Sequence, residues 1–114
     1  MEELHAVGGI DVVAYGHLQE LVSLAQQRTT DDARKTSIDA ELMQLLELQE
    51  QLRKNLGALG DSEREVTLRN RLLDDLEASE ERRRAIGVIR REIDQHGQER
   101  DIRQQALIDQ LYSP

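Results

Sequence analysis

The chain contains no cysteine, no phenylalanine and no tryptophan, and its single proline is the last of its 114 residues. The absence of cysteine excludes disulfide bonds, thiolate metal sites and thiol nucleophiles. Two tyrosines are the whole aromatic content, which disfavours a rounded core, because such cores rely on large aromatic side chains. With no internal proline, no position forbids a helix through a missing backbone donor. These absences favour long helices packed along narrow seams.

The sequence also lacks the segments that direct a protein to or across a membrane. No apolar stretch is long enough to cross a bilayer, and residues 1–5 lack the basic region and apolar run of a secretory signal. Charged residues make up 33% of the chain and the formal net charge is −8. An acidic surface repels nucleic acid and anionic lipid at long range. The sequence therefore predicts a cytoplasmic protein that binds neither nucleic acid nor membrane.

The clearest internal boundary is a helix stop followed directly by a helix start. Gly60 suits the left-handed position after a helix. Ser62 and Glu65 have the spacing of a capping box, in which the Ser62 hydroxyl accepts from the Glu65 amide and the Glu65 carboxylate reaches back. This pattern predicts a helical hairpin with its turn at residues 57–62.

Before this turn, apolar residues follow a 4-3 spacing on a helix from about residue 32 to residue 58, with Gln49 as the polar member. We expect this seam to drive self-association and Gln49 to fix its register. The seam residues are Ile38, Leu42, Leu45, Gln49, Leu52, Leu56 and Leu59.

A shorter amphipathic helix is predicted at about residues 11–28. The polar segment from Gln26 to Asp32 follows it, and Thr29 with Asp32 has the spacing of a helix cap. The apolar face also changes direction across this segment by roughly a third of a turn. A break between two helices is the interpretation that these signals favour, and one continuous helix is the alternative.

After the turn, the chain can remain helical from about residue 62 to residue 111. Its apolar residues form two blocks that differ in direction by about a quarter to a third of a turn, which predicts two different neighbours. The first block is Val66, Leu68, Leu72, Leu73 and Leu76, and the second is Ile86, Ile89, Ile93, Leu107 and Leu111.

The expected fold class is therefore all-α. It is an elongated helical hairpin, or a three-helix coiled-coil-like bundle, with one very long C-terminal helix. We expect a flexible arm at residues 1–9 and a single helical domain at residues 10–114, with helices at about 11–28, 32–58 and 62–111.

Motifs for catalysis, cofactors or metals are not evident in the sequence. No two histidines share the i, i+4 spacing of a helix-borne zinc pair, and the one Glu-x-x-His match, Glu2 with His5, has no counterpart elsewhere. No glycine-rich phosphate loop or nucleophile elbow occurs. We therefore expect no enzyme activity and no bound cofactor or metal.

One cluster in the long helix has the character of a protein-docking strip. An apolar strip lies beside a basic stripe, which suits an acidic amphipathic helix of another protein. The alternative is that this strip packs against the first helix of the same chain. The residues are Arg83, Arg84, Ile86, Ile89, Arg90, Arg91 and Ile93.

Apolar faces in excess of what a thin helical protein can bury predict association. We expect a protein-interaction or assembly adaptor with helical protein partners, forming a homodimer. Three alternatives stay open: a chaperone of the flagellar or type III export kind that holds an amphipathic helix, an acidic inhibitor of the phage-encoded kind, and a structural component of a virion.

Overall fold

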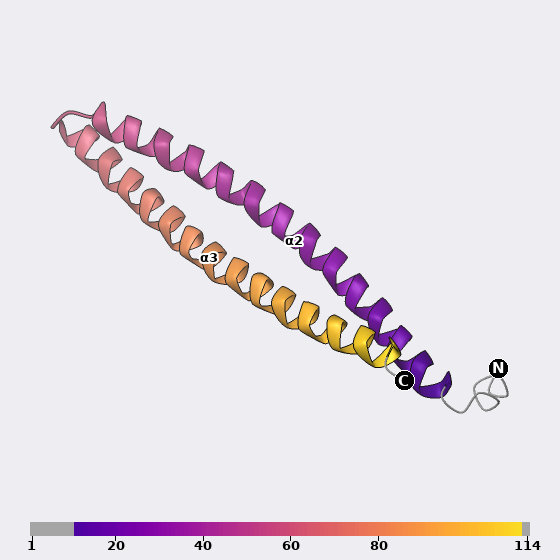
Figure 1. Ribbon diagram of the computed structural model, residues 1–114. Helices are drawn as coiled ribbons and strands as arrows, with labels where there is room; N and C mark the ends of the chain where they lie inside the picture. Colours follow the sequence, from indigo (N-terminus) through magenta and orange to yellow (C-terminus); the bar gives the residue numbers. More distant parts are fainter. Residues whose placement is uncertain (1–10, 113–114) are drawn as a thin grey trace. The chain divides into compact units, whose positions relative to one another are not determined.

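The computed structural model describes residues 11–112, which form two helices and the turn between them (Figure 1). Helix α2 runs from Asp11 to Gly57 and has 47 residues, and helix α3 runs from Glu63 to Tyr112 and has 50. Residues 11–112 contain no strand. The all-α class and the long C-terminal helix are confirmed, and the arm predicted at residues 1–9 lies outside the described residues.

Helix α2 is continuous through the segment where the sequence favoured a break, so the three-helix alternative is not supported. The segment contains neither glycine nor proline. The Thr29 hydroxyl donates to the Ala25 carbonyl at 3.2 Å, and the Thr30 hydroxyl donates to the Gln26 carbonyl at 3.1 Å. Both hydroxyls bond to a carbonyl four residues earlier in the same helix, so Thr29 does not act as a helix cap.

Packing divides the described chain into two units. Unit 1 contains residues 11–34 of α2 and 93–112 of α3, and unit 2 contains residues 35–92, including the turn. The predicted single domain over residues 10–114 stays a prediction. Two ion pairs in unit 1, Glu20 with Arg103 and Asp31 with Arg100, show that its two helical stretches are antiparallel, because the α3 number falls as the α2 number rises. In unit 2 the turn joins the stretches as a hairpin (Figure 1).

Each helix carries one unbroken seam with alternating spacings of three and four residues. Apart from Arg28 and Arg83, the seam residues are buried or partly buried. On α2 they are Ala14, His17, Leu21, Leu24, Arg28, Asp31, Lys35, Ile38, Leu42, Leu45, Gln49, Leu52, Leu56 and, just past its end, Leu59. On α3 they are Glu65, Arg69, Leu72, Leu76, Ser79, Arg83, Ile86, Arg90, Ile93, Gly97, Arg100, Gln104, Leu107 and Leu111.

These seams correct the predicted changes of direction in the apolar faces. The contact face does not change direction along either helix. Because polar residues occupy seam positions between the apolar blocks, a pattern traced through apolar residues alone departs from the residues that make the contact. The most deeply buried apolar side chains all belong to the seams. They are Leu52 and Ile86 in unit 2, and Ile93 and Leu107 in unit 1.

The turn contains the predicted capping box, with one difference. The Ser62 hydroxyl accepts from the Glu65 amide at 3.2 Å, while the Glu65 carboxylate accepts from the Gly60 amide. Gly60 does not adopt the left-handed conformation expected for it. A Cβ atom at Gly60 would lie 3.0 Å from the Glu65 carboxylate, so glycine here makes room for that carboxylate. Arg69 closes the turn by donating to the Gly60 carbonyl at 2.7 Å.

Candidate functional site

The residues that the sequence assigns to a self-association seam lie against α3 of the same chain. Gln49 is fully buried and Leu52 is 5% exposed, while the other five seam residues are partly buried. A second chain can reach this seam only if α2 and α3 of unit 2 separate. Self-association through it stays a prediction, and the described fold places the seam inside unit 2.

Gln49 makes the contact that its polar character predicts, and its partner is on α3. Its side-chain amide donates to the Ser79 hydroxyl at 3.2 Å, and that hydroxyl donates in turn to the Leu76 carbonyl at 2.7 Å. Arg83 Nη1 lies 3.5 Å from the Gln49 side-chain oxygen. Three polar groups therefore meet at one level of the seam, and a shift of register would separate them.

The predicted docking strip is largely turned toward α2. Ile86 is 1% exposed and Ile93 is 5% exposed, so both pack inside the fold. Arg90 donates to Asp39 of α2. The strip therefore faces the part of α2 that the sequence assigned to a helix at about residues 32–58, and docking of a partner against the strip stays a prediction. Of the remaining members, Ile89 is partly buried, while Arg83, Arg84 and Arg91 are exposed.

Two arginines on the flank of α3 pair with glutamates on the flank of α2, one pair in each unit. Arg103 donates to Glu20 in unit 1, and Arg82 donates to Glu41 in unit 2. These hydrogen bonds lower the pKa of each glutamate below its ordinary value, with the positive charge adding to the effect. Each bond also raises the pKa of its arginine. The pairs favour the antiparallel arrangement, which brings opposite charges together.

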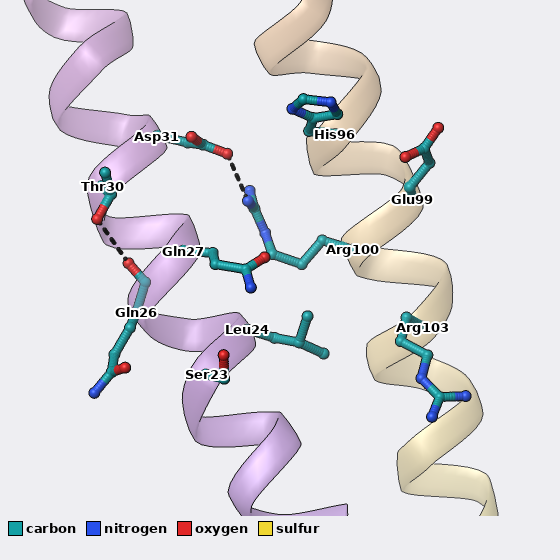
Figure 2. Close-up of a pocket in the computed structure, with 10 residues that line it drawn as sticks. All are labelled: Ser23, Leu24, Gln26, Gln27, Thr30, Asp31, His96, Glu99, Arg100 and Arg103. Atoms are coloured by element: carbon teal, nitrogen blue, oxygen red, sulfur yellow. Dashed lines mark hydrogen bonds and ion pairs between the residues drawn. The ribbon is translucent and has the colours of Figure 1, made fainter.

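The middle of unit 1 replaces apolar seam contacts with a buried ion pair. Arg100 reaches from α3 toward α2, where its Nη1 donates to Asp31 at 2.7 Å (Figure 2). The Arg100 side chain is 8% exposed and that of Asp31 is 16% exposed. The Nε atom of Arg100 is buried with no hydrogen-bond partner in the protein. Gly97 lies one turn earlier on the seam, and a Cβ there would make an ordinary van der Waals contact with Nη2 at 3.6 Å.

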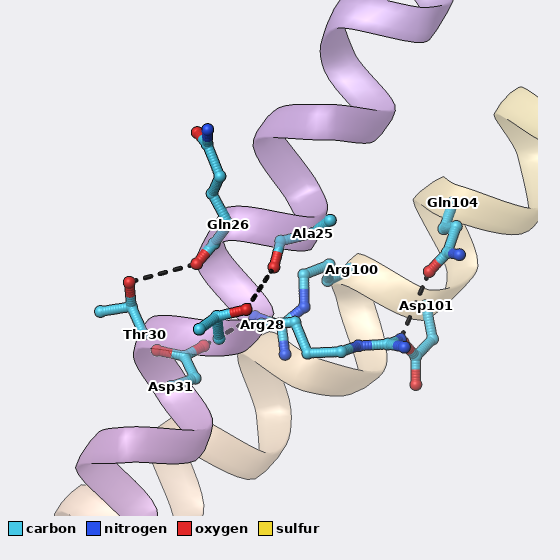
Figure 3. Close-up of polar contacts among 9 residues, drawn as sticks. Ala25, Gln26, Arg28, Thr30, Asp31, Arg100, Asp101 and Gln104 are labelled. Atoms are coloured by element: carbon cyan, nitrogen blue, oxygen red, sulfur yellow. Dashed lines mark hydrogen bonds and ion pairs between the residues drawn. The ribbon is translucent and has the colours of Figure 1, made fainter.

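A second arginine extends this polar layer. Arg28 of α2 donates to Asp101 and, at 3.3 Å, to Gln104 of α3 (Figure 3). Beside the layer lies an open groove lined mainly by residues of polar type, to which His96, Glu99 and Arg103 contribute from α3 (Figure 2). Within the part of the chain that the structure describes, no group of three or more histidines and carboxylates could hold a metal ion.

The sequence predicts excess apolar surface, but it did not locate the exposed apolar stripe on the first part of α2. On unit 1, Leu18 is 52% exposed and Val22 is 58% exposed, and both form an open apolar depression with Tyr15 on one side of α2. On unit 2, Met43 and Leu46 are exposed one turn apart on α2. The sequence pattern gave one apolar face to the first helix, although positions 15, 18 and 22 define a second stripe at helical spacing.

Comparison with protein-family models, with curated proteins and with solved structures finds no match for this chain. No helix within residues 11–112 is long and apolar enough to span a membrane.

Proposed function

We propose that this chain is a non-enzymatic interaction protein, an assembly adaptor that binds helical protein partners by helix packing. The observation that carries the proposal is the exposed apolar surface on α2, at Leu18 and Val22 in unit 1 and at Met43 and Leu46 in unit 2. Exposed apolar side chains are ordinary when they are scattered, but neighbouring ones at helical spacing characterise interaction sites. Their partners would supply an apolar helix face of their own.

The arginine pairs support a protein partner over nucleic acid. In unit 2, Arg82 and Arg90 are held by carboxylates of α2, so neither is free to neutralise a phosphate. The net charge of −8 opposes the approach of a polyanion. Arg84 and Arg91 are exposed, and they would add electrostatic attraction to an acidic protein helix. A cytoplasmic location stays part of this proposal.

A capture experiment with surface variants tests the role. Tagged chain is used to retain proteins from a lysate of the source organism, and the retained proteins are identified by mass spectrometry. The variant replaces four of the exposed apolar residues of α2 by glutamine, which preserves helix propensity: Leu18, Val22, Met43 and Leu46. A matched control replaces four exposed polar residues of the same helix, outside the depression, by alanine: Gln27, Arg34, Gln44 and Glu47.

We expect specific helical proteins with the wild type and the control, and their loss with the glutamine variant at unchanged circular dichroism. Equal capture by all three chains would contradict the proposal. The nature of the captured protein separates the remaining alternatives. An exported substrate would indicate a chaperone, a basic enzyme would indicate an inhibitor, and capsid or tail proteins would indicate a structural component.

A further inference from the structure

The first part of α2 in unit 1, from Val12 to Gln27, is almost free of charge. Between Val12 and Gln27 the chain has one charged residue, Glu20, in a protein of which 33% of residues are charged. Glu20 is paired with Arg103 on the flank opposite to Leu18 and Val22. Charged side chains are the ones that protein interfaces exclude from their centres, so this composition is typical of an interface.

The pairing of the two helices extends this side onto α3. Glu20 and Arg103 each precede a seam residue and pair on one flank, so Asp101, which follows a seam residue as Leu18 and Val22 do, lies on the other flank with them. Ile108 and Tyr112 follow Asp101 by seven and eleven residues, about two and three helical turns, so they continue the same side of α3. Because Asp101 pairs with Arg28, the antiparallel arrangement brings Ile108 and Tyr112 to about the level of Leu21 and His17, next to Val22 and Leu18.

The resulting surface, here called the unit 1 face, consists of Tyr15, Leu18, Val22, Ile108 and Tyr112. It contains both aromatic residues of the chain, and Tyr112 is 86% exposed. Tyrosine is enriched at protein interfaces because it covers a large area at a small cost in side-chain entropy. On α3 the face is bordered by Asp101, which is tied to Arg28, and by Asp109, which accepts from Gln105.

We propose that the unit 1 face binds a second copy of this chain, forming a two-fold symmetric dimer. Two chains of charge −8 repel one another wherever like charges meet, and an uncharged face is where identical copies can approach without that cost. The centre of the face offers no charge to a charged partner, and the bordering carboxylates of Asp101 and Asp109 already accept hydrogen bonds within the chain. The two-fold axis passes near Leu18, so that Val22 of each copy packs beside Tyr15 of the other.

This dimer is one specific form of the interaction role proposed above, and it rests on that role. The contact covers about two turns of one helix and part of a second, which is smaller than a standard interface. We therefore expect a dissociation constant on the order of micromolar. Added salt strengthens the dimer, because it screens the repulsion between the two acidic bodies without weakening any ion pair in the contact.

Analytical ultracentrifugation of the full chain tests the dimer. We expect a monomer–dimer equilibrium whose dissociation constant falls as sodium chloride is raised. The double variant Leu18→Glu with Val22→Glu would raise that constant by about tenfold or more, because the new carboxylates would be buried without partners. The matched control, Val66→Glu with Leu73→Glu, replaces exposed apolar residues of unit 2 and leaves the constant unchanged.

The absence of cysteine allows a second measurement that does not depend on a disruptive variant. Leu18→Cys would form an intermolecular disulfide under mild oxidation, and Val66→Cys would not. A wild type that is monomeric at all concentrations and salts, or equal cross-linking of both variants, would overturn the dimer. A monomer that still captures helical proteins through Leu18 and Val22 would remove the dimer and leave the proposed function standing.

Discussion

Gln49 and Ser79, thirty residues apart in sequence, are joined across the two helices by a hydrogen bond of 3.2 Å between buried side chains. Two short polar groups at the same level of an otherwise apolar seam define one register, because any shift leaves both without this partner. The Ser79 hydroxyl keeps a second bond to its own helix, while the Gln49 amide depends on α3.

A double-mutant cycle measures this dependence. Ser79→Ala leaves the buried Gln49 amide short of an acceptor, and we expect it to lower the free energy of unfolding by about 1–3 kcal/mol. Adding Gln49→Leu to Ser79→Ala should recover most of that loss, since neither polar group is then left unpaired. Urea denaturation followed by circular dichroism gives the four values. If the two substitutions add without coupling, the bond does not set the register.

For the buried ion pair of unit 1, removing one partner should destabilise the fold much more than replacing both partners. Asp31→Ala leaves the Arg100 guanidinium buried without its counter-charge, with Nε already lacking a partner, and should cost about 3–5 kcal/mol. Replacing both residues by leucine should return stability to the wild-type level or above, because apolar contacts then replace the pair. Equilibrium unfolding in urea compares the variants, with Glu47→Ala as an exposed control on α2. A small effect of Asp31→Ala, similar to that of the control, would count against a buried pair.

The flank pairs predict an acid-sensitive contribution to stability. The bond from Arg82 lowers the pKa of Glu41 in the folded state. A lowered pKa means that the ionised carboxylate stabilises the fold at pH values above the ordinary glutamate pKa of about 4.3, and that this contribution is lost as the pH falls through the folded-state pKa.

The difference in unfolding free energy between the wild type and Glu41→Gln should therefore be constant near pH 7 and shrink below about pH 4. Urea titrations at a series of pH values measure it. The same series with Glu47→Gln controls for the general loss of negative charge on acidification. A gap that stays the same at every pH would show that Glu41 stabilises the fold through packing alone.

Removing the helix cap in the turn between α2 and α3 should lower stability mainly in the first turn of α3. Glu65 satisfies the Gly60 amide and receives a hydrogen bond of 2.6 Å from the Ser62 hydroxyl, while Ser62 accepts from the Glu65 amide. Ser62→Ala removes the cap of α3 and should cost about 1 kcal/mol. Amide hydrogen exchange should show faster exchange confined to the first turn of α3. Uniformly faster exchange along unit 2 would mean that the turn controls the whole hairpin.

How much of the contact between α2 and α3 can be predicted from the sequence depends on which residue types form it. The turn could be predicted because Gly60, Ser62 and Glu65 interact with residues only a few positions away in the sequence. The seam from Ile38 to Leu59 could be predicted because it is mostly leucine at regular spacing.

The middle of unit 1 could not be predicted in this way. Asp31 and Arg100 occupy seam positions, yet each looks like an exposed residue until its partner from the other helix is known. The apolar faces therefore appeared to change direction along the helices, and a helix break was inferred where α2 is continuous. A test of the seam spacing that ignored residue type would have found the continuous pattern. The unit 1 face was missed for a related reason. Its stripe at Tyr15, Leu18 and Val22 can be recognised as exposed only once the seam stripe of α2 is known to be covered by α3.

The central claim is that the seam joins α2 and α3 within one chain and leaves the outer surface of α2 to partners. Thermal unfolding of the Leu18→Glu, Val22→Glu variant over a hundredfold range of protein concentration tests it most directly. An intramolecular seam predicts full helicity and a midpoint that does not depend on concentration. A midpoint that rises steadily with concentration would contradict the account, because the seam would then be formed between chains.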